Sequence, residues 1–133
     1  MLRKLTRKRA GFTLVEIMIV VAIIALLAAI AVPGFLRARK RSQASKILND
    51  LRMISSAIDQ YAIENSKKSD DVVEIVDWTK YIKKDIPLYA TGADLFGNTY
   101  GSQIVDSLPK VPLSSYNSLS DVTDNTFWSP YNP

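Results

Sequence analysis

The sequence predicts an α+β fold in which one long, bent N-terminal helix packs on a small C-terminal antiparallel sheet. Three observations on this chain of 133 residues lead to that prediction. Residues 12–32 are apolar apart from one acid, residues 44–61 repeat apolar side chains at steps of three and four, and turn-forming sequence dominates after residue 87. Once a leader and an apolar span are set aside, the chain retains one small domain.

A basic leader comes first and is followed by the apolar run. Residues 1–11 contain five cations, Arg3, Lys4, Arg7, Lys8 and Arg9. From Phe12 to Val32 there are 21 residues whose only charge is Glu16. At about 1.5 Å of rise per residue this run forms a helix of roughly 31 Å, close to the ~30 Å hydrocarbon core of a bilayer. We therefore expect one transmembrane segment over residues 12–33.

Glu16 requires an explanation, because ionisable side chains in membrane segments are unfavourable. One interpretation places this acid at the level of the lipid headgroups, in contact with water. A second interpretation follows if the chain is cut after Gly11. The new α-amine of Phe12 is then a cation one helical turn from Glu16, and the two charges neutralise each other within one subunit or between two.

The N-terminal segment resembles the prepilin segment of type IV pilins and of the pseudopilins of type II secretion. The matching residues are Gly11, Phe12-Thr13-Leu14-Val15-Glu16, the apolar run to Val32, and Pro33. The resemblance covers about the first 60 residues. It implies cleavage between Gly11 and Phe12, N-methylation of Phe12, and assembly into a helical filament in which Phe12 and Glu16 pair. It also implies a pilin-like fold.

The same resemblance implies partners and a location. The partners are a prepilin peptidase and methyltransferase, other copies of the chain, a pilus or secretion assembly platform, and inner-membrane lipids. The chain would cross the inner membrane once, with its N-terminus in the cytoplasm, and lie outside the cytoplasm after assembly. Charge alone indicates orientation weakly, because a second basic cluster, Arg37, Arg39, Lys40 and Arg41, follows the span. That cluster lacks interleaved aromatic residues, so we expect no nucleic-acid partner.

Two other fates of the N-terminus compete with this interpretation. Ala29-Ile30-Ala31 resembles the cleavage site of an ordinary secretory signal peptide, but the apolar run exceeds the usual ~7 to 15 residues and contains an acid. An uncleaved signal anchor accounts for the span, and leaves Glu16 and the Gly11-Phe12 junction unexplained.

An amphipathic helix is predicted over residues 34–66, directly after the span. Pro33-Gly34 predicts a kink, since an interior proline removes a hydrogen bond and clashes with the preceding turn. The helix could instead end at Val32, but apolar residues resume at helical spacing on one face: Ala44, Ile47, Leu48, Leu51, Ile54, Ile58 and Tyr61. We therefore expect a single helix over residues 13–65 whose second half packs on the small domain.

Residues 67–133 are predicted to form that small globular region. A helix over residues 77–84, with Asp77 as its N-cap and Trp78 and Tyr81 on one face, is favoured over a strand formed by Val72, Val73, Ile75 and Val76. From Pro87 onward, turns and short strands are expected.

Two features of this region are predicted to be structural. Residues 94–100 resemble a degenerate form of a turn segment of major pseudopilins, in which Gly97 and Asn98 adopt turn conformations and bring Phe96 and Tyr100 onto the sheet. Trp128 and Tyr131 are expected to anchor the C-terminus.

Composition limits the chemistry that the chain can perform. It contains no cysteine and no histidine, which excludes disulfides, His-based catalytic triads and the usual zinc sites. We predict no catalytic site, no enzyme activity, no cofactor and no metal site. Major pseudopilins carry a calcium loop near the C-terminus, and here the oxygen ligands in the corresponding region are Ser120, Asp121, Thr123, Asp124 and Asn125, which is a weak signal.

Charge is divided unevenly along the chain. Residues 1–66 carry 11 basic and 4 acidic side chains, whereas residues 67–133 carry 6 and 9. Basicity therefore belongs to the leader and to the start of the amphipathic helix.

The leading hypothesis is a structural subunit of a type IV pilus or secretion pseudopilus, and the alternative is a membrane-anchored, extracytoplasmic ligand-binding module. Pilus and secretion roles share one subunit design and are not separated by sequence.

Overall fold

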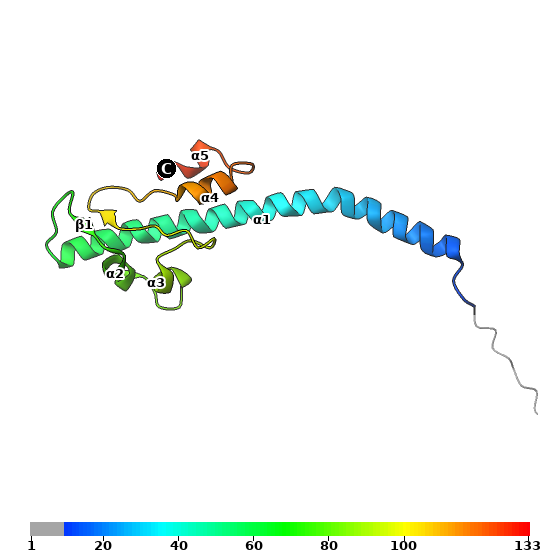
Figure 1. Cartoon of the computed structure of the whole chain (residues 1–133), viewed down its shortest axis with the longest axis horizontal. Coiled ribbons are helices and arrows are strands. Elements are labelled where there is room, and N and C mark those ends of the chain that lie inside the picture. Colours follow the sequence, from blue (N-terminus) through cyan, green and yellow to red (C-terminus); the bar gives the residue numbers. More distant parts are fainter. Residues whose placement is uncertain (1–9) are drawn as a thin grey trace, which may run out of the picture. The chain divides into compact units, whose positions relative to one another are not determined.

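The structure is a computed structural model that describes residues 10–133. The chain divides into two compact units, the first ending at Leu36 and the second comprising Arg37–Pro133. The elements in order are α1 (Leu14–Glu64), β1 (Val72–Val73), α2 (Ile75–Trp78), the 3-10 helix η1 (Thr79–Tyr81), α3 (Pro87–Thr91), β2 (Gln103–Ile104), α4 (Leu113–Ser118) and α5 (Asn125–Trp128) (Figure 1).

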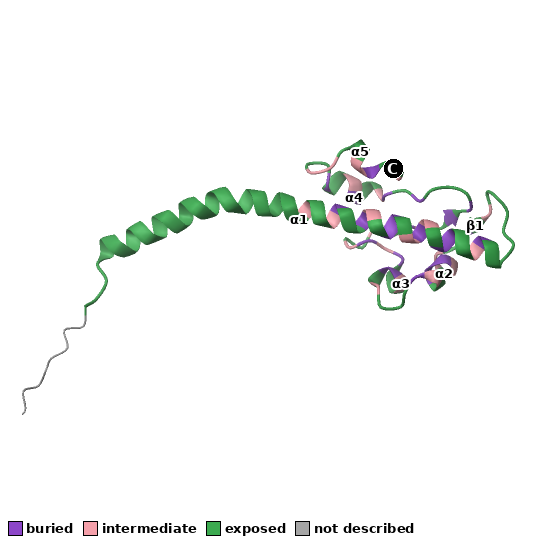
Figure 2. Ribbon diagram, turned by 180° about the vertical axis from the view of Figure 1, so that it is seen from behind, coloured by how far each residue is buried: buried purple, intermediate pink, exposed green. Residues whose placement is uncertain are grey.

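Helix α1 confirms the prediction of one long helix within a residue at each end. It spans Leu14–Glu64 and contains Pro33 in its interior, so the interpretation that a helix ends at Val32 is wrong. The kink at Pro33 and Gly34 stays a prediction. Every side chain of the helix from residue 14 to residue 36 is exposed (Figure 2). Within residues 10–133, α1 is the one helix long and apolar enough to cross a membrane.

The core of the second unit lies along one face of α1. The buried residues of the helix follow helical spacing, as predicted: Ala44, Ile47, Asp50, Leu51, Ile54, Ala57, Ile58 and Ala62. In Figure 1, α2 and α3 lie on one side of α1 and α4 and α5 on the other. Each side contributes a fully buried indole to the core, Trp78 from α2 and Trp128 from α5. The amphipathic stripe is therefore core, as its spacing predicts.

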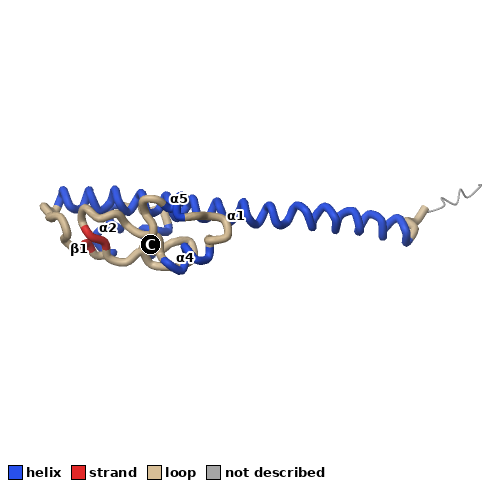
Figure 3. The backbone as a smooth tube through the Cα atoms, turned by 90° about the horizontal axis from the view of Figure 1, so that it is seen from above, coloured by secondary structure: helices blue, strands red, loops and turns tan. Residues whose placement is uncertain are grey.

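The antiparallel sheet is present but consists of two strands of two residues each (Figure 3). Val72 pairs with Ile104 and Val73 with Gln103, and Ala93 and Thr99 form an isolated bridge. The expectation of strands and turns after Pro87 is wrong in part, because α3, α4 and α5 lie there. Pro87 begins α3 at its first turn and Asp124 caps α5, so residues that indicate turns start short helices here.

Residues 72–81 contain both a strand and a helix, where the sequence analysis favoured a helix over residues 77–84. Val72–Val73 forms β1, α2 begins at Ile75, and η1 ends at Tyr81. Asp77 is not the N-cap. It lies in the first turn of α2, where Lys80 pairs with it at 3.1 Å. Trp78 is buried as expected, and Tyr81 is half-buried.

The turn at residues 94–100 forms largely as predicted. The side chain of Asp94 accepts hydrogen bonds from the backbone N–H groups of Phe96 and Asn98, at 2.9 and 3.0 Å. Gly97 has a φ of 84°, a conformation that favours glycine. Tyr100 is buried, whereas Phe96 remains 42% exposed, so the expectation that both rings pack is right only for Tyr100.

The C-terminus is anchored as expected. Trp128 is fully buried, and the backbone oxygen of Tyr131 accepts a hydrogen bond from the N–H of Val111 at 2.9 Å.

Candidate functional site

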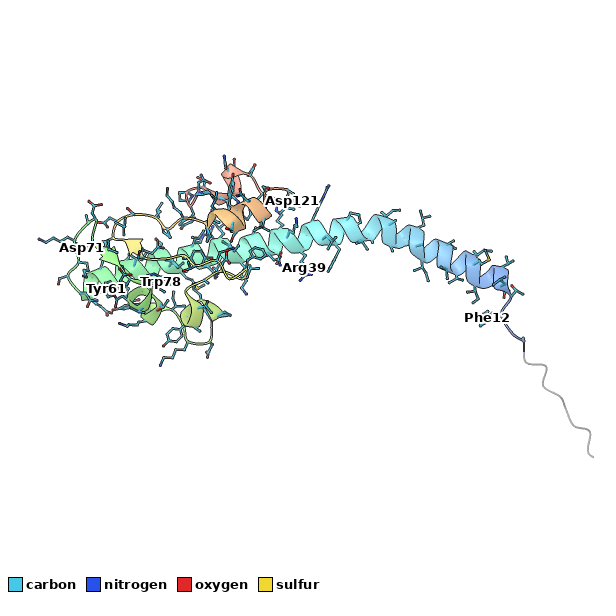
Figure 4. The ribbon with its side chains drawn as sticks, in the orientation of Figure 1. Phe12, Arg39, Tyr61, Asp71, Trp78 and Asp121 are labelled. Atoms are coloured by element: carbon cyan, nitrogen blue, oxygen red, sulfur yellow. The ribbon has the colours of Figure 1, made fainter. Side chains whose placement is uncertain are left out.

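The predicted processing site lies immediately before α1. Gly11 and Phe12 precede the first helical residue, Leu14, and both are exposed, Phe12 by 85% (Figure 4). A peptide bond in an exposed, non-helical segment is accessible to a protease. The basic leader residues 1–9 lie outside the described residues. Cleavage between Gly11 and Phe12, and methylation of Phe12, stay predictions.

Thr13 and Glu16 form a reciprocal cap at the start of α1. The Thr13 N–H donates to Oε2 of Glu16 at 2.8 Å, and the Glu16 N–H donates to the Thr13 hydroxyl at 3.3 Å. This arrangement is a capping box, in which two of the otherwise unpaired N–H groups of a helix start find side-chain acceptors. Glu16 also lies in the first turn, where the helix dipole favours a negative charge.

Sequence reasoning missed the role of Thr13, although its signal was present. Thr-x-x-Glu followed by an apolar run is the pattern of a capping box. The cap adds a reason for the presence of Glu16 to the two given above, which are contact with water at the headgroup level and pairing with the Phe12 amine. The Glu16 carboxylate can accept both the Thr13 N–H and the Phe12 ammonium, because it offers about four lone-pair positions and the Thr13 N–H occupies one of them.

The remainder of the first unit is an apolar helix surface. Glu16 is the one charged residue among residues 10–36, and large apolar side chains from Leu14 to Leu36 are between 47% and 78% exposed. Fully burying one such side chain is worth about 1.5–3 kcal/mol, so this surface strongly favours lipid or other apolar helices over water. A helix that is apolar apart from one acid in its first turn is suited to insertion into a membrane and to packing against other apolar helices.

A basic cluster opens the second unit. Arg37, Arg39 and Arg41 are exposed, and in residues 10–133 none of them forms an ion pair. Lys40 differs from them, because its Nζ lies 2.8 Å from Oδ2 of Asp121. In Figure 4, Arg39 and Asp121 are at one end of the second unit, and Asp71 and Tyr61 are at the other.

In the candidate calcium loop, the side-chain oxygens of Asp121, Asp124 and Asn125 each have a protein partner. The carboxylate of Asp121 pairs with Lys40, that of Asp124 accepts the Phe127 N–H at 2.9 Å, and the amide oxygen of Asn125 accepts the Tyr116 hydroxyl. No group of three acidic side chains suited to a metal occurs within residues 10–133. Calcium requires six to eight oxygens directed at one point. Here the oxygens have separate protein partners.

A buried polar network lies beside the α1 stripe. Asp50, which is 5% exposed, accepts the Tyr100 hydroxyl at 3.3 Å. Asp94 accepts the Ser115 hydroxyl, which in turn accepts the amide of Asn98 at 2.8 Å. Burial raises the pKa of Asp50, and burial together with the charge of Asp50 raises that of Tyr100. Neither group is ionised more readily than usual, so the network joins segments of the fold and offers no activated nucleophile.

One of several open hollows in the second unit is a shallow groove of about 280 Å³. It lies between α1 and the segment after α2, and its lining includes Met53, Ala57 and Ile82. The Tyr81 hydroxyl at its edge donates to Glu64 at 2.5 Å and is therefore engaged. Binding pockets usually enclose about 300–1,000 Å³ with several convergent polar groups. This groove is smaller, and its lining residues supply no convergent set of charged groups.

The N-terminal segment matches a known family motif. Residues 6–32 match the family described as the prokaryotic N-terminal methylation motif. The match includes Gly11, Phe12, the capping box and the apolar helix.

Curated relatives match the first half of the chain. The type II secretion system core protein G of Vibrio cholerae is 38% identical over 63 residues, which is 47% of this chain and 43% of that protein. The type IV major fimbrial protein FimA of Dichelobacter nodosus is 43% identical over 70 residues, 53% of this chain and 42% of that protein. The type IV major pilin protein PilA of Myxococcus xanthus is 43% identical over 68 residues, 51% of this chain and 31% of that protein.

The chain thus spans less than half the length of these relatives. No solved structure matches it significantly.

Proposed function

We propose that this chain is a structural subunit of a pilus-like or pseudopilus filament, because its N-terminal half is similar to type IV pilins and to the type II secretion system core protein G. The observation that carries the proposal is the start of α1. A single acid, Glu16, is held in a capping box in the first turn of α1, and the exposed apolar helix carries no other charge as far as Leu36. Apolar helices of this kind can exchange lipid for one another without a large change in solvation.

Maturation is the first step of the proposed function. A prepilin peptidase cuts between Gly11 and Phe12 and a methyltransferase modifies the new amine. The exposure of both residues and the match of residues 6–32 to the methylation motif support this step. Loss of the leader removes five cations, and it leaves an α-ammonium one turn from Glu16.

Glu16 then has two roles in the proposed assembly. Its carboxylate continues to cap α1 through the Thr13 N–H, and it neutralises the Phe12 ammonium of the same or a neighbouring subunit. Both charges would otherwise lie unpaired among apolar helices, where an uncompensated charge is strongly unfavourable. Pairing at one defined depth would therefore set the axial register between neighbouring subunits.

Before assembly, α1 would hold the subunit in the inner membrane as a single-pass protein, with the second unit outside the cytoplasm. The partners of the filament subunit are other copies of this chain and an assembly platform. The proposal includes no enzyme activity. The alternative, a membrane-anchored ligand-binding module, is supported less well because the groove beside α1 is shallow and lacks convergent charged groups.

Two substitutions at Glu16 test the role of its charge. Glu16→Gln keeps an oxygen that can cap the helix and removes the charge, whereas Glu16→Leu removes both. We expect both variants to insert into membranes and to be cleaved, and neither to form filaments in cells that carry the assembly machinery. Filaments of normal abundance from Glu16→Gln would refute the ion pair and leave only the capping role.

Mass spectrometry of the purified mature chain tests maturation independently. We expect a polypeptide that begins with a methylated Phe12. An intact Met1 would favour an uncleaved anchor, and a start at Val32 would favour a secreted protein. Either result would contradict the filament proposal.

A further inference from the structure

The loop of residues 119–125 is attached to α1 by one polar contact. Nζ of Lys40 donates to Oδ2 of Asp121 at 2.8 Å, across 81 positions of sequence. Within residues 10–133, no other side-chain hydrogen bond joins α1 to α4, α5 or this loop. The rest of the attachment is apolar, through buried Leu119 and partly buried Val122.

The loop itself is ordered by its own hydrogen bonds. The backbone N–H groups of Val122 and Thr123 both donate to the Leu119 oxygen, at 3.0 and 3.1 Å. The Thr123 hydroxyl donates to the same oxygen at 2.8 Å and accepts the indole N–H of Trp128 at 3.0 Å. Asp121 is thereby presented to α1 from a turn that is closed by hydrogen bonds to the Leu119 oxygen.

Three cationic side chains lie near Asp121 on the side that faces α1. Arg37 and Arg41 line the same hollow of about 310 Å³ as Asp121 and Val122. The hydrogen bond from Lys40 is the largest of the influences that lower the pKa of Asp121, and Arg37 acts in the same direction. A divalent cation in this hollow would meet two arginines and one carboxylate, which is an unfavourable balance of charge. A neighbouring hollow of about 300 Å³ over the loop is lined by Asp121 and Asp124 with Arg41. There Asp121 is already paired with Lys40 and Asp124 with the Phe127 N–H.

We propose that the ammonium of Lys40, and not a bound calcium ion, fastens the C-terminal loop to α1 in this protein. The remaining candidate ligands support this assignment, because Asp124 caps α5 and Asn125 is engaged by Tyr116. The loop is then independent of calcium but sensitive to salt, since both partners are about half exposed, at 43% and 54%, and exposed ion pairs are screened. This proposal does not depend on filament formation.

Hydrogen exchange on the full chain in detergent micelles tests the proposal. Lys40→Met removes the tether. Arg39→Met is the matched control, because it removes one charge from the same cluster and Arg39 has no ion pair within residues 10–133. We expect Lys40→Met to speed exchange at the amides of Val122 and Thr123 by about two- to fivefold, and Arg39→Met to leave it nearly unchanged. Equal effects of the two substitutions would overturn the tether.

Calcium, chelator and salt complete the test on the unmodified chain. We expect calcium at about 5 mM and an excess of EDTA to give the same loop exchange and the same melting temperature. Raising salt to about 0.5 M should speed loop exchange in the unmodified chain and not in Lys40→Met. Protection of the loop by calcium, or an increase in melting temperature with calcium, would overturn the proposal.

Discussion

The hydroxyl of Thr13 accepts a hydrogen bond from the Glu16 N–H at 3.3 Å and so caps the start of α1. We predict that Thr13→Val, which has nearly the same shape, will weaken the start of α1 by about 1 kcal/mol, because Ser and Thr caps contribute roughly that much. Exchange at the amides of residues 14–17 measures the effect. Thr13→Ser retains the hydroxyl and should behave like the unmodified chain. Fast exchange in Thr13→Ser as well would show that the hydroxyl is not the cause.

Asp50 is a carboxylate buried in the apolar stripe of α1. Burial raises the pKa of Asp50 above the ordinary value of 3.8, the nearby charge of Asp94 adds to the increase, and Tyr100 and Lys46 oppose it. The folded state therefore binds the Asp50 proton more tightly than the unfolded state does. By linkage, the contribution of Asp50 to stability falls as pH rises through the interval above 3.8.

We predict that Asp50→Asn will stabilise the second unit at pH 7. Asparagine can still accept the Tyr100 hydroxyl and carries no charge to desolvate, so the expected gain in unfolding free energy is a few tenths to about 1 kcal/mol. Urea unfolding at pH 7 and near pH 3 measures it. The gain should vanish at the acidic pH, where Asp50 is protonated. A loss of stability of similar size at both pH values would contradict the prediction.

Sequence reasoning at the residue scale identified Glu16 and missed how it is held. The acid was conspicuous because its neighbours are apolar, whereas Thr13 looked ordinary. Asp50 and Asp94 were also unremarkable in sequence, because nothing local distinguishes a buried acid from a solvated one. Their partners, Tyr100 and Ser115, are contributed by distant segments, and pairing over that separation is decided by the fold.

At the scale of the elements, the end of α3 lies close to α2 because Gly92, which follows α3, has no side chain. Gly92 follows α3 with a φ of 58°, and a Cβ at this position would lie 2.6 Å from Cγ2 of Ile75. Its backbone conformation and its closeness to α2 both require the absence of a side chain. Gly97 has a φ of 84°, but a Cβ there would meet nothing within 4 Å.

We therefore predict that Gly92→Ala destabilises the second unit by about 1–3 kcal/mol more than Gly97→Ala does. Both substitutions introduce backbone strain, and only the first also forces α2 and α3 apart. Chemical denaturation of the two variants measures the difference. Equal losses would mean that the packing around Ile75 yields without penalty.

The elements differ in how far their sequences predict them. Helix α1 was predicted within a residue at each end, because a periodic apolar pattern over many turns outweighs one interior proline. The helices α2 to α5 have four to six residues each, too few to show a period. They are stabilised by residues that join the core, as Trp78 and Trp128 do. Tertiary contacts decide such elements, and local sequence carries little of that information.

On the scale of the molecule, the two units differ in what they need to be stable. No side chain in residues 10–36 is buried, whereas the second unit has its own core around α1. We predict that a fragment comprising residues 37–133 folds in water without the first unit. Its melting temperature should lie within about 3 °C of that of the full chain in detergent. Circular dichroism during heating measures both. An unfolded fragment would show that the second unit needs the apolar helix.

At this scale the sequence predicted an apolar segment over residues 12–33, an amphipathic helix over 34–66 and a small globular region over 67–133, from hydropathy and charge. The way in which the small domain surrounds its helix was not predicted. Residues after Pro87 were expected to pack as a sheet on the stripe. Instead, short helices and loops cover both sides of it (Figure 1).

The position of the core stripe early in the chain has a consequence for biosynthesis. Residues 44–62, on which everything later packs, leave the ribosome before any segment that covers them. Each later segment can therefore pack on residues that have already been synthesised, and β2 likewise follows its partner β1 in the chain. Folding in this order limits the time during which the apolar stripe is open to aggregation.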